Sequence, residues 1–181
     1  MKITLACLGL CIAVVAGGSA FVYSGIADVS ATSSHWAVTR WMLSTTMESS
    51  VRRHARGVTP PPSFDGDDHV HEGARAYDAM CASCHGAPGR DPGVVGKGLN
   101  PEPPLLAKVA DDWSPAEVFW VTANGVRMTG MPAFGPTHSE DELWDLVALV
   151  KRLPRMSTAE YRALLAPRAG DDLVHGHSHE H

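Results

Sequence analysis

The sequence predicts an all-α protein, and two observations indicate this class. At three places a serine is followed three residues later by a glutamate, and each pair can satisfy amide groups that the start of a helix leaves free. The chain also begins with an uninterrupted apolar run that suits one long helix. The serine and glutamate pairs are Ser114 with Glu117, Ser139 with Glu142, and Ser157 with Glu160.

Composition favours one globular domain with appendages. The chain has 181 residues, of which 44% are hydrophobic and 19% charged, and this length suits a single packed core. The formal net charge of -5 is mildly acidic. A basic surface typical of nucleic-acid binding is not indicated, so we expect no nucleic-acid partner.

The N-terminal apolar run predicts a membrane anchor. No charged residue occurs from Ile3 to Ala27, and this length is enough to cross a bilayer as a helix. We therefore expect residues 1–27 to be an uncleaved anchor. The alternative is a cleaved secretory signal, because the small residues 18–20 resemble a cleavage site. Both interpretations export the rest of the chain.

The segment after the apolar run predicts a juxtamembrane helix over residues 28–57. It contains Trp36 and Trp41 and ends in a basic cluster. Such a helix could lie at the membrane surface, or it could be solvated with its aromatic rings against the domain. Consecutive prolines then predict a linker over residues 58–70, because proline removes an amide donor and restricts the preceding residue.

The motif Cys81-Ala82-Ser83-Cys84-His85 carries the strongest chemical signal. A Cys-x-x-Cys pair alone fits a redox dithiol, half of a zinc site or a haem attachment site, and the histidine that follows favours haem. Residues three apart in a helix project to the same side, so Cys81 and Cys84 can both reach one haem edge. His85 can then direct its imidazole at the iron.

Around this motif the chain resembles a class I c-type cytochrome. In that family an N-terminal helix runs into the attachment motif and a C-terminal helix crosses it. Gly73 and Tyr77 match the approaching helix, with a glycine that would let another helix pack closely. The resemblance implies one covalent haem c within residues 71–166, enclosed by irregular loops. The protein is then expected to have a class I cytochrome c fold behind an N-terminal transmembrane helix.

The helix predicted after Ser139 matches the C-terminal helix of that family. Its apolar residues recur at spacings of three and four, and Pro154 ends it. Trp144 or Leu143 is expected to supply bulk where the two helices cross. The apolar positions are Leu143, Leu146, Val147, Val150 and Leu153.

A methionine is the expected second axial ligand by the same resemblance. The family places this residue in a Gly-Met-Pro loop, and the chain has Gly130-Met131-Pro132. Pro132 disfavours a helical conformation at Met131, so its sulfur sits on extended backbone. Met128 is the competing candidate, and packing at the haem edge suits it better than ligation.

A proline carbonyl is expected to orient His85, again by resemblance. Pro101, Pro103 and Pro104 all lie in the loop after the motif, and the sequence leaves the choice among them open. We assign Pro103 and Leu99 to the haem environment. The carbonyl would make the imidazole a stronger donor.

The chain ends in a histidine-rich stretch, which predicts a disordered tail over residues 167–181. Alternate histidines can gather around a divalent metal such as copper, nickel or zinc. The tail is therefore a possible metal site or simply a polar tail of biased composition. The four histidines are His175, His177, His179 and His181.

These patterns predict an electron carrier and not an enzyme. Two axial ligands would leave no open position on the iron for a substrate. We expect a single-pass protein of a bacterial inner membrane, with its haem domain in the periplasm and redox proteins as partners. Two alternatives are a dedicated redox subunit of a membrane dehydrogenase or oxidase, and a haem protein linked to metal sensing or handling through its tail.

Overall fold

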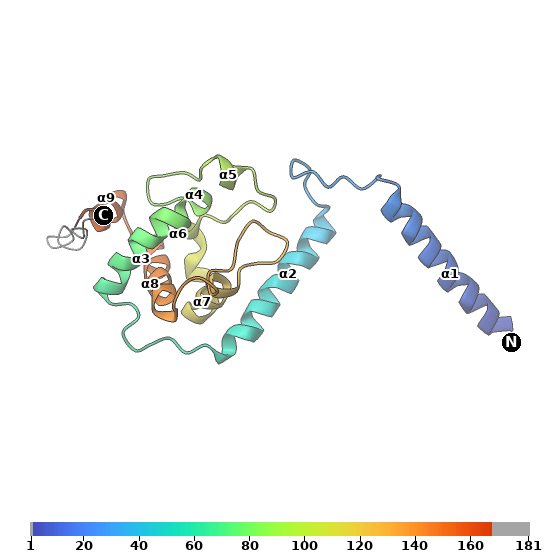
Figure 1. Cartoon of the computed structure of the whole chain (residues 1–181), viewed down its shortest axis with the longest axis horizontal. Helices are drawn as coiled ribbons and strands as arrows, with labels where there is room; N and C mark the ends of the chain where they lie inside the picture. The colour runs from blue at the N-terminus through green and yellow to red at the C-terminus, as the bar shows by residue number, and fades with distance from the viewer. Residues whose placement is uncertain (1, 168–181) are drawn as a thin grey trace, which may run out of the picture. The chain divides into compact units, whose positions relative to one another are not determined.

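A computed structural model describes residues 2–167 of the chain. They belong to two compact units, Met1–His35 and Trp36–His181. Within residues 2–167 the regular secondary structure is helical and no strand is present, as the sequence predicts (Figure 1). The expected histidine tail lies outside the described residues.

The first unit contains one long helix, α1 (Lys2–Tyr23). The stretch Ile3–Tyr23 has a mean hydropathy of 2.3 and is long and apolar enough to cross a membrane. Its side chains are exposed within this unit, as a helix surrounded by lipid requires. This N-terminal helix is compatible with a single-pass membrane anchor.

The second unit begins with α2 (Ala37–His54), which continues into the short 3₁₀ turn η1 (Ala55–Gly57). The helix starts later than residue 28 because the side chain of Asp28 accepts a hydrogen bond from the Ser30 amide at 2.9 Å and holds a turn instead. The end of α2 and η1 pack on α7 (Pro115–Asn124).

The core of the second unit is the crossing of α3 (Asp67–Met80) and α8 (Glu140–Arg152). Gly73 lies at the crossing, where an added Cβ would be 2.0 Å from the carbonyl oxygen of Asp145. The expected close approach of two helices at Gly73 is therefore confirmed. Helix α3 starts inside the expected linker, because its first turn has two acidic residues that stabilise a helix N-terminus.

Helix α8 contributes most of the buried side chains. Both Leu143 and Trp144 are buried, and the Trp144 ring stacks on Phe119 of α7 at 4.4 Å. This contact joins α7 to the core and so positions the loop that follows α7. The buried residues of α8 are Leu143, Trp144, Leu146, Val147, Ala148, Leu149 and Val150.

Short helices complete the unit. All three serine and glutamate pairs form capping boxes, at the starts of α7, α8 and α9, as predicted. Helix α8 ends in a 3₁₀ turn that contains Pro154. The remaining elements are α4 (Ala82–His85), α5 (Val94–Lys97), α6 (Leu106–Val109), η2 (Ala110–Asp112), η3 (Leu153–Arg155) and α9 (Thr158–Leu164).

Candidate functional site

The Cys-x-x-Cys-His motif forms a single helical turn directly after α3. The amides of Cys84 and His85 donate to the carbonyl of Cys81 at 3.0 and 2.9 Å. The two cysteines therefore lie on one side of the turn, as their spacing predicts. Both are partly buried and neither forms a disulfide.

The surroundings of the motif do not favour a zinc site. Burial raises the pKa of the Cys81 thiol to about 12. A structural zinc site has four protein ligands, and Cys81 and Cys84 would supply only two of them. Within residues 2–167, moreover, no group of three or more His, Cys, Asp or Glu side chains is placed to hold a metal.

His85 is held in one tautomer by the loop that precedes α6. Its Nδ1 atom lies 2.8 Å from the carbonyl oxygen of Pro104, and a carbonyl can only accept. Nδ1 therefore carries the proton, and Nε2 keeps its lone pair for a ligand. Of the three prolines that the sequence left open, Pro104 supplies this carbonyl; Pro103, beside it, is half-buried.

Burial also keeps His85 neutral. It lowers the pKa of the imidazole, while the hydrogen bond to Pro104 acts in the opposite direction and is the smaller effect. A neutral imidazole is the form that can bind a metal ion. The residue that the sequence selected as a ligand thus has the required protonation state and orientation.

Helix α5 lies directly against the motif through glycine. A Cβ added at Gly96 would be 2.8 Å from the Cα and carbonyl oxygen of Cys84. The amide of Gly93 donates to the carbonyl of Ser83 at 2.9 Å. Sequence analysis missed both glycines, because in a glycine-rich loop no local pattern shows which residue meets the motif backbone.

Met131 occupies a tight turn after α7. The Thr129 hydroxyl donates to the carbonyl of Val126 at 2.7 Å and accepts from the Met131 amide at 3.1 Å. Met131 is half-buried, whereas Met128 is 88% exposed. Sequence analysis also missed Thr129, although threonine hydroxyls commonly hold a turn through hydrogen bonds to nearby backbone groups.

The Met131 turn closes on the end of α7 at one glycine. Gly125 has φ of +65°, and an added Cβ would be 2.7 Å from the backbone carbon of Pro132. A side chain is disfavoured at this position for both reasons. Gly125 is the C-cap residue at which α7 ends.

The two loops of the site meet at Leu99. A Cβ added at Gly130 would be 2.6 Å from the methyl carbons of Leu99, so the residue beside Met131 touches the loop that follows the motif. Leu99, predicted to belong to the site from the sequence, is therefore brought against the Met131 turn.

Two tyrosines, one on α3 and one on α9, form hydrogen bonds next to the motif. The hydroxyl of buried Tyr77 donates to the carbonyl of Gly86 at 2.7 Å, and burial raises the pKa of Tyr77. Tyr161 donates to Asp78 at 3.0 Å, and Asp78 also pairs with Arg90. These contacts join α3, α9 and the turn after His85.

Comparison with known proteins agrees with this geometry. Residues 68–150 match the family model of cytochrome c oxidase, cbb3-type, subunit III. The chain contains a c-type cytochrome domain. The matched segment of the cytochrome domain includes the attachment motif, Met131 and most of α8. Comparison with curated proteins gave no match.

The residues of the cytochrome domain suit its cofactor, covalently bound haem c. Two unbridged cysteines lie on one turn, and the adjacent imidazole has a free Nε2. A half-buried thioether lies in a turn whose neighbouring residue contacts the loop after the motif. The two cysteines and the adjacent histidine fit the covalent attachment of haem c. The domain is therefore one for haem-based electron transfer.

Proposed function

We propose that the chain is a membrane-tethered periplasmic cytochrome with one haem, which carries single electrons between redox partner proteins. Cys81 and Cys84 would hold the haem through thioether bonds, and His85 and Met131 would bind its iron. When bound, the haem iron supplies a one-electron redox couple. The protein's part is to attach, orient and enclose this group.

The observation that carries the proposal is the 2.8 Å contact between His85 Nδ1 and the Pro104 carbonyl. It leaves Nε2 unprotonated and fixes the plane of the ring. It also makes the imidazole a stronger electron donor. The chemistry of a redox dithiol does not require a histidine that is oriented in this way.

Met131 is proposed as the second ligand because a side-chain hydrogen bond and the proline that follows fix the conformation of its turn. The Thr129 hydroxyl holds the Met131 amide, and Pro132 keeps the residue out of a helix. A thioether ligand raises the reduction potential relative to a second imidazole. Such a ligand would also occupy the position that an enzyme would need for substrate, which supports the role of electron carrier.

The tether supports a carrier role at the membrane. Helix α1 is long and apolar enough to span a bilayer. Anchoring would raise the effective concentration of the haem domain near membrane-bound donors and acceptors. Both interpretations of the N-terminal helix, anchor and secretory signal, export the residues that follow it. Export would place the haem domain in the periplasm.

Haem stoichiometry and redox titration test the proposal. Matured in a host that attaches haem c, the chain should gain the mass of one haem and titrate with one electron. Replacing Cys81 and Cys84 together by alanine should abolish covalent attachment, whereas Ser83→Ala, an exposed position between them, should not. Covalent haem in the double variant, or none in the native chain, would contradict the proposal.

A second candidate is a dedicated redox subunit of an oxidase or dehydrogenase. The name of the matching family model, which describes a subunit of cytochrome c oxidase, favours this candidate. Purification in a mild detergent distinguishes the two. A free carrier should elute as this chain alone, whereas a subunit should remain with other membrane proteins in fixed proportion.

A further inference from the structure

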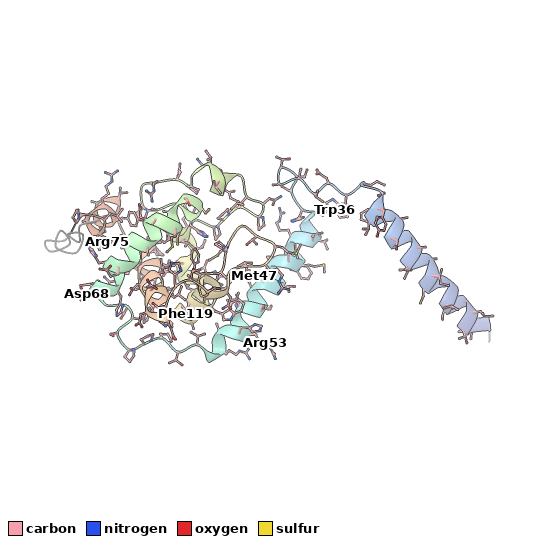
Figure 2. All side chains as sticks on the ribbon, in the orientation of Figure 1. Trp36, Met47, Arg53, Asp68, Arg75 and Phe119 are labelled. Carbon is pink, nitrogen blue, oxygen red and sulfur yellow. The ribbon has the colours of Figure 1, made fainter. Side chains whose placement is uncertain are left out.

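The first half of α2 has apolar side chains that nothing in residues 36–167, the described part of the second unit, covers. Trp36 is 84% exposed and Trp41 is 65% exposed, and three aliphatic neighbours are also exposed: Val38, Met42 and Leu43. Of the two interpretations of this helix, aromatic rings packed against the domain are thereby excluded. Figure 2 shows Trp36 at the start of α2 and Arg53 near its end.

The second half of α2 behaves differently because it is packed. Val51 and Ala55 are buried, and the ring of His54 stacks on Trp120 at 5.3 Å. The helix is thus fixed to the cytochrome domain at one end. The apolar first half of α2 therefore continues directly from a packed stretch of the same helix.

Three of the exposed residues share a face of the first turns, because Trp41 and Met42 lie three and four residues after Val38. Trp36 precedes this face as the N-cap of the helix. Val51 lies on a different face, toward α7. An apolar face of this kind on a monomer marks a surface that meets a partner or a membrane.

Charge indicates which of these the face meets. From residue 29 to residue 47 the sequence has no aspartate or glutamate, and Arg40 is its one lysine or arginine. The chain as a whole has a net charge of -5, so this stretch departs from the average. Tryptophan and arginine without acidic neighbours suit the headgroup region of an anionic bilayer.

The covalent chain brings this face within reach of a membrane. The 13 residues from Ser24 to Trp36 join α1 to α2. Fully extended, they would span at most about 45 Å. The first turns of α2 are therefore restricted to the neighbourhood of the bilayer whenever α1 crosses it.

We propose that the start of α2, namely Trp36 at its N-cap and the face formed by Val38, Trp41 and Met42, inserts into the headgroup region of an anionic lipid bilayer. This inference rests on the proposed anchoring by α1 and goes beyond it. The cytochrome domain then has two attachments to the membrane, the spanning helix and the surface of α2. Two attachments restrict the rotation of the domain relative to the membrane, whereas a single tether would not.

Quenching of tryptophan fluorescence by brominated lipid tests this directly. The full holoprotein is reconstituted in vesicles of phosphatidylcholine and phosphatidylglycerol, with and without bromine on the acyl chains near the headgroup. Bromine quenches only tryptophans that it touches, and the chain has five tryptophans. We expect quenching in the native chain, and its loss when Trp36 and Trp41 are both replaced by phenylalanine. Quenching that survives in this double variant, or none in the native chain, overturns the proposal.

Matched valine variants provide the control. Val38→Asp places a carboxylate on the proposed face and should reduce quenching, whereas Val94→Asp changes an equally apolar, 88% exposed residue of α5 and should not. The haem spectrum of each variant checks the fold. Retention of every variant in salt-washed vesicles reports anchoring by α1 separately. Equal quenching in the two variants would contradict insertion of α2 even where α1 is anchored.

Discussion

The crossing of α3 and α8 and the loops around the motif are stabilised in different ways (Figure 1). At the crossing, large side chains are buried, and α8 alone buries seven residues. In the loops, backbone hydrogen bonds and glycine contacts replace side-chain burial: between residues 86 and 105, Gly86, Pro92 and Gly96 are the buried positions. The crossing therefore determines stability, and the loops determine the geometry of the site.

The largest effect is expected at the crossing. Gly73→Ala would place a methyl group 2.0 Å from the Asp145 carbonyl, and the two helices would have to separate. We expect a loss of about 3 kcal/mol in the free energy of unfolding. Gly57→Ala is the control, because an added Cβ there meets nothing within 4 Å. Denaturant unfolding followed by circular dichroism measures both, and similar values for the two would refute the comparison.

A glycine of the site loops should have a smaller effect on stability and a larger one on the haem. Gly125→Ala combines a left-handed backbone with a contact at 2.7 Å to Pro132, which we expect to cost about 2 kcal/mol. The Met131 turn should shift, so the visible spectrum should change. Gly98→Ala, where the nearest contact is 3.4 Å, is the matched control. An unchanged spectrum in Gly125→Ala would show that the turn does not depend on this residue.

The link between the two regions should have an intermediate effect. Tyr77→Phe removes the hydroxyl that donates to Gly86 and leaves that carbonyl without this donor, at a cost of about 1.5 kcal/mol. Tyr161→Phe removes a less buried bond to Asp78 and should cost less. Thermal or denaturant unfolding of the two holoproteins measures the loss of stability in each. A larger loss for Tyr161→Phe than for Tyr77→Phe would contradict this prediction.

Loss of a helix cap should have the smallest effect of the four. Ser139→Ala removes the side chain that accepts from the Glu142 amide at the start of α8, and such a cap contributes about 1 kcal/mol. The haem spectrum should not change, because the cap lies at the start of α8 and not in the Met131 turn. A spectral change without loss of stability would contradict the division between the two regions.

The sequence predicts the crossing better than the loops. Capping boxes, apolar spacing and Pro154 define α8 from neighbouring residues alone, and Gly73 indicates where another helix can approach. The choice of Pro104 among three prolines depends instead on contacts across the fold. So do the roles of Gly96 and Thr129. Helices of four residues such as α5 and α6 have little intrinsic stability, so tertiary contacts decide where they form.

The visible spectrum of the oxidised holoprotein tests the central claim most directly. The native chain should show the weak sulfur-to-iron band at the red end of the spectrum. Met131→Ala should lose the band, and its reduction potential should fall by the order of 0.2 V, within the range that axial ligands control. Met128→Ala, at an exposed position three residues earlier, should retain both properties. A native spectrum without this band, or a Met131→Ala variant that keeps it, would contradict ligation by His85 and Met131.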